Sequence, residues 1–502
     1  MRLKKTLLLK SLLAATLFIL SIMSVYAATE LTDQEITNAI DRELMFNSAV
    51  SSYLIDVETD EGIVALSGTV NNLRTKERAV QIAGAVKGVR GIVNEIDVEA
   101  LSRSNITLEN EVTDALLEDP ATDSYEINVK ADQGKVTLTG TVDSWQEKQL
   151  SGYVAKGVKG ITELENNLIV DYKTDRSDIE IKQDIVQSLK NDVRIDHALI
   201  DVNVKDGEVT LSGKVGSVNE RTLAVSESWV VGVSSVDSDE VEITEWARAE
   251  NLRKDKYIPK SDEEIKDAVN DAFLYDPRVY SFNPEVSVFN GTVTLTGTVN
   301  NLKAKRAAEH DARNVVGVFN VNNYLKVRPV YVPEDYQLES DVEAAIDNNI
   351  LFESWDVDVT ASAGLVYLNG EVDSYFQKKQ AEDIASKTKG VIAVENNLKV
   401  NDTNDYYYDN YYGWNSFYAP GYIDVSDDYL TDFEIENRIQ NQLWWSPYVN
   451  EDEVDVLVAG GTAVLTGTVE TQREKLYAEV NALEGGADEV ENNLIVSYNP
   501  KK

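Results

Sequence analysis

The side chains best suited to catalysis or metal binding are scarce in this sequence. The 502 residues include two histidines, His197 and His310, and no cysteine. The histidines fall at non-equivalent positions of the sequence repeat described below, so neither a histidine-based triad nor a zinc site is indicated. Without cysteine there is no disulfide, no thiolate ligand and no attachment residue for bacterial lipidation. We therefore predict a protein that is not an enzyme and uses no cofactor or metal.

Carboxylates are abundant, with 87 Asp and Glu residues. At that density, closeness in sequence does not single out an acid–base pair of the kind that cleaves glycosidic bonds. Residues 56–62 (DVETDEG) faintly resemble a calcium-binding loop. The segment lacks the alternating Asp or Asn ligands and the distal Glu of an EF-hand. We interpret it as a charged hairpin turn.

Basic residues gather at one recurring place, just after a predicted strand and near the start of a predicted helix. A cation at a helix N-terminus opposes the helix dipole. One interpretation is pairing with nearby acids and solvation; the other is a repeated contact for anions, such as phosphate headgroups or an acidic partner. The residues that would form this anion or lipid contact are Arg74, Lys76, Arg78, Lys303, Lys305, Arg306, Lys378, Lys379, Arg473 and Lys475.

Aromatic residues gather in a second place, the segment 402–430, which contains DYYYDNYYGWNSFYAPGY. No helical or strand period covers it. One interpretation is a linker packed on adjacent units. Because aromatic rings stack on sugars and sit at interfaces, the other is a contact with glycan, peptidoglycan or a protein partner.

The elements that carry these residues are organised by a nine-residue frame, Gly-x-Val-x-Leu-x-Gly-x-Val, which occurs six times with one substitution, Ala463. The alternating apolar residues share one face of a strand. The first Gly suits a hairpin turn with positive φ, and the second indicates a bulge or a close backbone approach. We predict structural roles for Gly62, Gly68, Gly134, Gly140, Gly207, Gly213, Gly291, Gly297, Gly364, Gly370, Gly461 and Gly467.

Around each frame the same elements recur. An apolar stripe at i, i+4 and i+8 precedes it, for example Ile36, Ile40 and Leu44, and indicates an amphipathic helix. Four of these helices begin with a Ser or Thr followed three residues later by Glu, which is a capping box. A short strand, the frame strand, a second helix and a last strand complete the unit. The fold class is therefore α+β: six tandem αββαβ units, each a three-stranded mixed sheet with two helices on one face.

The unit boundaries follow from the alignment of the six frames. We predict repeats at 32–99, 104–172, 177–244, 261–328, 334–401 and 431–498, with linkers at 245–260 and 402–430. Each unit is small enough that a core of its own is only marginally stable. We therefore expect neighbouring units to pack on one another, particularly across the short linkers near 100–103 and 173–176.

The N-terminus and the net charge limit where the protein works. Residues 1–27 read as a cleavable secretory signal peptide, with Arg2, Lys4 and Lys5 before an apolar run and a small-residue cut after Ala27. No other stretch is apolar enough to span a bilayer. A net charge of −40 opposes nucleic acid binding and adsorption to anionic lipid. We predict a soluble periplasmic protein, with secretion as the alternative.

The six units resemble the BON domain (bacterial OsmY and nodulation). The resemblance rests on the frame, the preceding helix and a Gly-Ile or Gly-Val turn before the last strand, as at Gly160-Ile161 and Gly390-Val391. It implies an αββαβ fold in an envelope protein with no catalytic residues, and an association with osmotic stress, phospholipid surfaces or support of other envelope proteins. This chain differs from simpler relatives in its six copies, its Tyr-rich insertion and its acidity.

These observations predict a non-enzymatic exported protein that acts as a multivalent binding or protective scaffold in the bacterial envelope. Its expected partners are envelope proteins or a phospholipid surface, with glycan as a partner of the Tyr-rich segment. Several weak sites on one chain raise the effective concentration for binding. The alternative is a periplasmic stress chaperone for envelope proteins.

Overall fold

The computed structural model describes residues 31–46, 54–119, 121–122, 127–173, 176–244, 247, 260–349, 352, 357–372, 375–400, 431–446 and 448–497. The predicted signal peptide, most of the linker 245–260 and the Tyr-rich segment 402–430 lie outside these residues. Each repeat contributes two α-helices. The first helices are α2 (Asp33–Phe46), α4 (Asn105–Glu118), α6 (Asp178–Asn191), α8 (Asp262–Tyr275), α10 (Asp335–Asp347) and α12 (Asp432–Trp445). The second helices are α3 (Leu73–Ala85), α5 (Trp145–Lys156), α7 (Val218–Glu227), α9 (Leu302–Arg313), α11 (Tyr375–Lys387) and α13 (Gln472–Glu484).

Each repeat also forms one small sheet. The first strands are β1 (Ile55–Asp60), β4 (Asn128–Asp132), β7 (Ile200–Lys205), β10 (Glu285–Phe289), β15 (Val357–Ser362) and β19 (Val454–Ala459). The frame strands are β2 (Ile63–Val70), β5 (Lys135–Val142), β8 (Glu208–Val215), β11 and β12 (Thr292–Thr296 and Thr298–Val299), β16 (Leu365–Val372) and β20 (Thr462–Val469). The last strands are β3 (Gly91–Val98), β6 (Glu163–Val170), β9 (Ser235–Ile243), β13 and β14 (Asn320–Asn323 and Lys326–Val327), β17 and β18 (Ala393–Asn396 and Lys399–Val400), and β21 and β22 (Glu489–Asn492 and Ile495–Val496).

The strand pairing confirms the predicted α+β class and the αββαβ unit. In repeat 1 the frame strand β2 lies in the middle, antiparallel to β1 and parallel to β3. Parallel pairing needs a crossover, and the second helix α3 supplies it. Both helices pack on the same face, because the stripe residues Ile36 and Ile40, the helix residue Ala79 and the strand residue Leu66 share one buried cluster.

The frame glycines have the structural roles predicted for them. Glu61 and Gly62, at the hairpin tip of repeat 1, have φ of 46° and 75°, as a two-residue type I′ turn requires. Gly68 has φ of 111°, and a Cβ placed on it would lie 2.0 Å from the carbonyl oxygen of Leu54. Gly213 makes the same close approach to Leu199, at 2.1 Å. Gly467 is equally close to the carbonyl oxygen of Glu453, at 2.0 Å, whereas a Cβ on Gly297 would have no neighbour closer than 3.8 Å. The second frame glycine therefore marks a close backbone contact in repeats 1, 3 and 6.

The helix starts are also as predicted, and they hold the hairpins in place. In repeat 3 the backbone N–H of Glu180 donates to the hydroxyl of Ser177 while the Glu180 carboxylate accepts from the Ser177 N–H, which completes the capping box. Asp178, which follows Ser177, accepts hydrogen bonds at 2.9 and 3.0 Å from the backbone N–H groups of Asp206 and Gly207. Equivalent aspartates serve repeats 1, 4 and 6. The first helix thus clamps its own hairpin tip.

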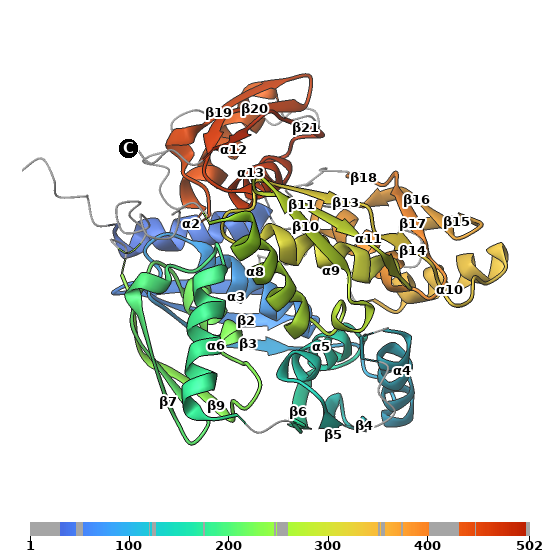
Figure 1. Cartoon of the computed structure of the whole chain (residues 1–502). Coiled ribbons are helices and arrows are strands. Elements are labelled where there is room, and N and C mark those ends of the chain that lie inside the picture. Colours follow the sequence, from blue (N-terminus) through green and yellow to red (C-terminus); the bar gives the residue numbers. More distant parts are fainter. Residues whose placement is uncertain are drawn as a thin grey trace, which may run out of the picture.

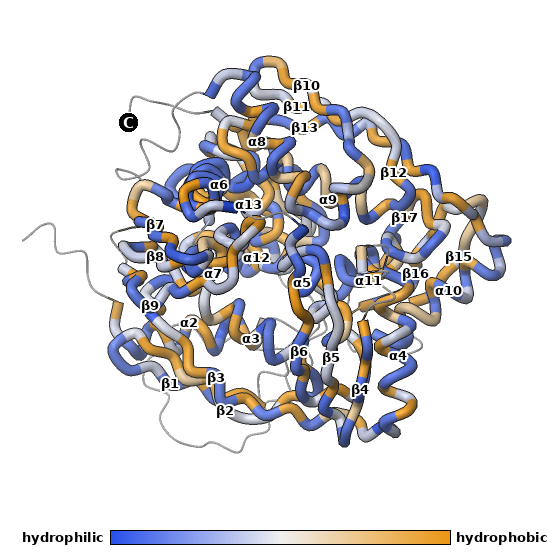
Figure 2. The backbone as a smooth tube through the Cα atoms, turned by 60° about the horizontal axis from the view of Figure 1, so that its bottom comes forward, coloured by the Kyte–Doolittle hydropathy of each residue, from blue (hydrophilic) through white to orange (hydrophobic). Residues whose placement is uncertain are grey.

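The apolar core is divided among the repeats. Each repeat has its own buried cluster, built from the stripe of its first helix and the frame strand. Figure 2 shows the apolar stretches distributed over all the repeats rather than gathered in one place. The polar and charged residues of the second helices are therefore left to fill the space between repeats.

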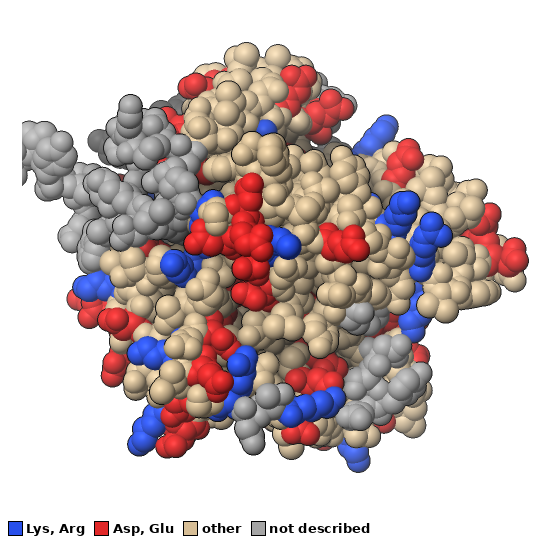
Figure 3. Space-filling view, in the orientation of Figure 1, with Lys and Arg blue, Asp and Glu red and all other residues tan. Residues whose placement is uncertain are grey.

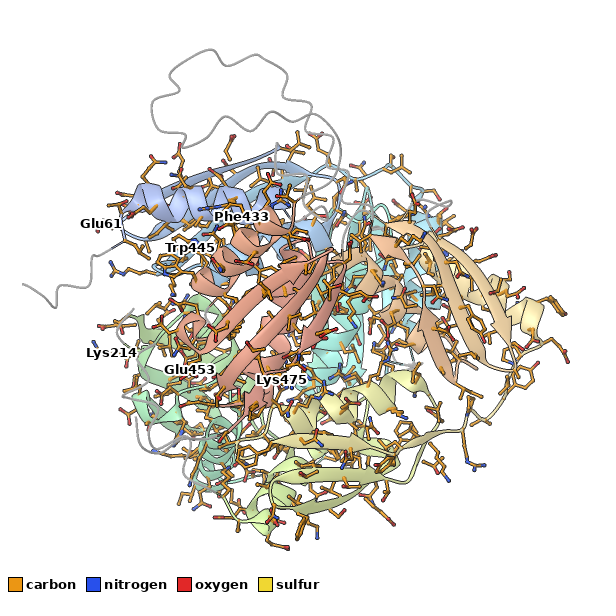
Figure 4. The ribbon with its side chains drawn as sticks, turned by 90° about the horizontal axis from the view of Figure 1, so that it is seen from above. Glu61, Lys214, Phe433, Trp445, Glu453 and Lys475 are labelled. Carbon is orange, nitrogen blue, oxygen red and sulfur yellow. The ribbon has the colours of Figure 1, made fainter. Side chains whose placement is uncertain are left out.

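The repeats associate in three pairs, 1 with 6, 2 with 5, and 3 with 4. Trp445, at the end of α12 in repeat 6, joins the buried cluster of repeat 1 (Figure 4). Short antiparallel backbone bridges join repeats 2 and 5 at Val158 and Asn349, and repeats 3 and 4 at Asp192 and Val315. In each pair, the end of one repeat's second helix meets the end of its partner's first helix.

Around these pairs, repeats 1–3 and repeats 4–6 each form a ring through their second helices. Repeats 4–6 occupy the upper part of Figure 1 and surround a common centre in Figure 4. When the repeats are aligned on their second frame glycine, one contact between repeats occurs three times. In each case the residue at the position of Arg74 contacts the residue that another repeat has at the position of Gln81. The contacts are Arg74 over the ring of Tyr153 at 3.3 Å, Asn219 with the Gln81 carbonyl at 3.5 Å, and Arg473 with His310 at 3.2 Å. Equivalent positions thus repeat the same contact in cyclic order, as in two stacked three-membered rings.

Candidate functional site: the centre between the repeats

The predicted basic residues lie largely between repeats. Five contact another repeat: Arg74 with Tyr153, Arg78 with Glu484, Lys303 with Asp119, Arg306 with Glu382, and Arg473 with His310. Two donate to carbonyl oxygens of their own last strand, Lys76 to Ile96 and Lys475 to Leu494. Lys379 lies 3.7 Å from Glu382, while Lys305 and Lys378 form no ion pair with a described residue. The structure does not gather these ten residues into one exposed patch, and the anion contact stays a prediction.

A missed signal lies in the Asn residues at the last strand. The side-chain amide of Asn166 donates to the backbone carbonyl of Lys148, one turn into the second helix, at 2.7 Å. Asn323, Asn396 and Asn492 make the same bond to Lys305, Lys378 and Lys475 at 2.8 Å. The sequence pattern marked where the strand begins, but the bond also fixes how the second helix, with its basic residues, sits on the sheet.

Two cavities lie where the second helices meet. The first measures about 750 Å³ and lies between repeats 1, 3, 5 and 6; the second measures about 940 Å³ and lies between repeats 1, 2, 3 and 4. Gln81, Arg194 and Thr222 line both, so the cavities adjoin at α3 and α7. Both have the volume of small-molecule sites.

Two equivalent charge clusters line the second cavity. Arg194 bridges Asp192, at 2.9 Å from Nε, and Glu227, at 3.3 Å from Nη2. At the equivalent positions of repeat 4, Arg278 lies 2.9 Å from Asp276 and 3.9 Å from Asp311. Burial, together with the neighbouring Asp192, raises the pKa of Glu227. Burial and Asp276 likewise raise the pKa of Asp311. Each arginine is thus neutralised inside its own repeat.

His310 lies between these clusters and the first cavity. Its side chain is 47% exposed, and that exposure faces the second cavity, which it lines. Nε2 lies 3.2 Å from an Nη atom of Arg473, and Nδ1 lies 3.3 Å from the amide nitrogen of Asn314. The walls of the cavity limit the hydration of the ring, and this partial burial, helped by Arg473, lowers the pKa of His310 to about 3. Burial is the larger of these two causes, and the charge of Arg473 is the smaller one.

Tyr side chains form one wall of the first cavity. The rings of Tyr448 and Tyr477 are stacked with centroids 4.2 Å apart and planes 14° apart. The guanidinium carbon of Arg473 lies 4.2 Å from the centroid of Tyr477. The amide of Asn219, from repeat 3, donates to the Tyr448 hydroxyl at 3.1 Å. Residues from repeats 3 and 6 therefore build this wall together.

A large exposed apolar residue recurs on the outer surface, in the first turn of the first helix of most repeats. Position 34 of repeat 1 corresponds in four other repeats to a large apolar residue that is 71–72% exposed: Ile106, Ile179, Tyr336 and Phe433. Gln34 and Glu263 occupy it in repeats 1 and 4. This side chain is largely exposed, and sequence reasoning missed the recurrence because it looked for buried positions.

Around these residues the surface is acidic. Figure 3 shows a column of acidic side chains along α8, formed by Asp262, Glu263, Glu264, Asp267 and Asp271. None of the helices that the structure describes combines the length and apolarity needed to cross a bilayer. In the same described part of the chain, no three His, Asp or Glu side chains are placed to share a metal ion.

With this geometry in place, the relationship to known proteins can be stated. The BON-domain family model matches residues 32–100, 106–172, 177–245, 261–329, 334–402 and 431–498. The chain belongs to the BON-domain family. The αββαβ units described above are its BON repeats.

Two relatives share part of this tandem array. Osmotically-inducible protein Y of Escherichia coli is 29% identical over 143 residues, which cover 27% of this chain and 71% of that protein. The outer membrane lipoprotein DolP of Haemophilus influenzae is 36% identical over 107 residues, or 20% of this chain and 55% of that protein. Among solved structures, CdsD of the Chlamydia trachomatis type III secretion system covers 41% of this chain and 90% of its own at 16% identity, but its TM-score of 0.12 is too low to carry an argument.

Proposed function

We propose that this BON protein is a non-enzymatic, multivalent scaffold of the bacterial envelope that attaches to phospholipid surfaces through the exposed apolar residue of its first helices. The observation that carries the proposal is the recurrence of Ile106, Ile179, Tyr336 and Phe433 at one exposed position. Its relatives support the setting, since one is named as osmotically inducible and the other as an outer membrane lipoprotein. A periplasmic location follows from the predicted signal peptide and belongs to the proposal.

The physical case rests on repetition. An apolar side chain gains about 1.5–3 kcal/mol when it is fully buried, so one residue alone binds an interface weakly. Four such residues on one body raise the effective concentration of each contact after the first. Ile106 and Ile179 belong to one ring of repeats, and Tyr336 and Phe433 to the other. The protein would therefore present contacts in more than one direction and could bridge two surfaces.

Charge decides which surface is expected. The acidic residues that flank the first helices repel anionic lipid. We therefore expect binding to zwitterionic phosphatidylethanolamine and phosphatidylcholine vesicles, with weaker binding when phosphatidylglycerol is added. Added salt should narrow that difference, because it screens the repulsion.

Flotation of the full chain with these vesicles tests the proposal. Changing Ile106, Ile179, Tyr336 and Phe433 together to Ser should reduce the bound fraction at least tenfold. The matched control changes Phe289, Tyr324, Leu457 and Ile169 to Ser, because these residues are similar in type and 62–75% exposed, but lie on or beside the sheets. The proposal fails if the chain floats with neither type of vesicle, or if the control loses as much binding as the test variant.

The alternative is a chaperone that holds unfolded envelope proteins on the same apolar residues. Exposed apolar side chains beside acidic ones suit basic, unfolded clients. Suppression of client aggregation by the chain, lost in the first quadruple variant and accompanied by no vesicle flotation, would favour this alternative.

A further inference from the structure

Arg473 is a partly buried cation that forms no ion pair with a described carboxylate. In the part of the chain that the structure describes, its guanidinium contacts neutral groups, the imidazole of His310 and the ring and hydroxyl of Tyr477, and no carboxylate. Its Nε is buried and has no hydrogen-bond partner among the described residues. Of the five N–H donors of the guanidinium, one on each Nη atom meets His310 or Tyr477. An arginine without an ion pair is unexpected inside a chain of net charge −40.

The neighbouring arginines differ from Arg473 in this respect. Arg194 is held by Asp192 and Glu227, and Arg78 by Glu484 at 3.1 Å. Lys378, from repeat 5, also lines the first cavity and forms no ion pair with a described residue. Two positive charges from two repeats thus face one cavity without a protein counterion.

Among the acids that line this cavity, Glu484 pairs with Arg78, and Asp488 and Glu489 are exposed at its rim. Glu43 lines the same cavity, and its burial, together with the nearby Glu484, raises the pKa of Glu43 to about 7. At neutral pH much of its negative charge is therefore absent. On the other side of Arg473, the imidazole of His310, whose pKa is lowered to about 3 mainly by burial, adds no negative charge.

We infer that the first cavity binds a small soluble organic anion, a carboxylate or phosphate carried on a planar or apolar body. Arg473 and Lys378 would hold the anionic group, and the stacked rings of Tyr448 and Tyr477 would contact the body of the ligand. The cavity volume of about 750 Å³ suits a molecule of this class. Lys399 and Glu489 line its rim and are exposed, so the cavity opens to solvent there.

This site is separate from the outer apolar residues of the proposed function, and the two can fail independently. The interior position also explains why sequence reasoning saw only a repeated basic cluster. Arg473 and Tyr448 belong to repeat 6 and Lys378 to repeat 5, and the packing of these two repeats brings them to one cavity.

Calorimetric titration of the full chain with benzoate, benzamide and inorganic phosphate tests the inference. Benzoate should bind with one-to-one stoichiometry. Benzamide, its neutral isostere, should bind at least tenfold more weakly, because it lacks the charge that Arg473 and Lys378 would hold. Inorganic phosphate should bind more weakly than benzoate, because it has no body to contact the Tyr rings.

Two variants and a control locate the binding. Arg473→Gln should weaken benzoate binding at least tenfold, as expected for a lost charge-assisted hydrogen bond. Lys378→Gln, which changes a partly exposed side chain and so spares folding, should weaken it severalfold. Arg328→Gln removes an equal charge from an exposed position outside the cavity and should leave the affinity unchanged.

Three results would overturn the inference. They are the absence of saturable benzoate and phosphate binding at millimolar concentration, equal affinity for benzoate and benzamide, and equal losses in Lys378→Gln and Arg328→Gln. Thermal melting of each variant shows whether it is folded, and the Lys378→Gln result stands even if Arg473→Gln melts early.

Discussion

The ion pair between Lys303 and Asp119 joins repeats 4 and 2, and removing Lys303 is expected to be costly. Nζ and Oδ2 lie 2.9 Å apart, and the two side chains are only 8% and 1% exposed. Lys303→Met keeps the length of the side chain but leaves the carboxylate of Asp119 buried without its main counterion. Breaking a buried pair in this way costs about 3–5 kcal/mol.

The lower end of that range applies here. The backbone N–H of Ala121 donates to Asp119 at 3.1 Å, and Lys387 contributes a second favourable charge. We therefore expect Lys303→Met to lower the free energy of unfolding by about 3 kcal/mol. Because Lys303 lies between repeats, the loss should appear as a shift of one cooperative transition and not as the melting of a single repeat.

Urea unfolding followed by tryptophan fluorescence and circular dichroism measures this change. Asp119→Asn alone and the double variant complete a mutant cycle, and the double variant should be more stable than Lys303→Met because no unpaired charge remains. Lys135→Met, which removes an exposed pair with Glu163 within one repeat, should cause no measurable change. If Lys303→Met is as stable as Lys135→Met, repeats 2 and 4 are not packed as described.

Three further predictions concern pH and backbone geometry. Because the pKa of Glu43 is raised to about 7, the folded state holds a proton that the unfolded state has released between about pH 4.5 and pH 7. The free energy of unfolding should therefore fall by about 1.4 kcal/mol per pH unit over that range. Glu43→Gln should flatten this slope in urea titrations at several pH values. The low pKa of His310, about 3, has the opposite sign: stability should fall as the pH drops from about 6.5 towards 3, and His310→Gln should remove that part of the acid sensitivity. Gly68→Ala places a methyl group 2.0 Å from a carbonyl oxygen and should lower the free energy of unfolding by more than about 3 kcal/mol. Gly460→Ala, at a residue with positive φ but open space around it, should lower it by about 1 kcal/mol. Equal melting temperatures for the two variants would contradict the close approach at Gly68.

The fold of a single repeat could be predicted from the sequence because its determinants are local. The capping box of Ser177 and Glu180, the hairpin glycines and the alternating apolar residues all act within one repeat, and each signal recurs in most or all of the six copies. The contacts between repeats are different. Arg74, Asn219 and Arg473 occupy the same position of the unit and meet one equivalent position of another repeat, but that position holds a different residue type each time. No periodicity in the sequence reports such pairings.

The candidate sites were predictable only in part for the same reason. The basic residues of the second helices were identified, but a charge count cannot tell an exposed arginine from one that faces a cavity. Their partners separate them: Arg306 lies against the carboxylate of Glu382 in the next repeat, while Arg473 lies against the imidazole of His310. The exposed apolar residues at the first helices went unnoticed because Ile106 and Phe433 look like ordinary helix residues until their exposure is known.

Because residues at equivalent positions differ between repeats, the six similar units can adopt one particular arrangement. Because the repeats share a fold, a repeat could in principle pack against any of the others. Lys303 with Asp119, Arg306 with Glu382, and Arg78 with Glu484 each join two particular repeats. An exchange of neighbours would bury at least one of these charges without its partner, at a cost of several kcal/mol. The ion pairs therefore select one packing among the alternatives more than they add stability. Hydrophobic contacts between similar surfaces are poorly suited to that role, because they do not distinguish one repeat from another.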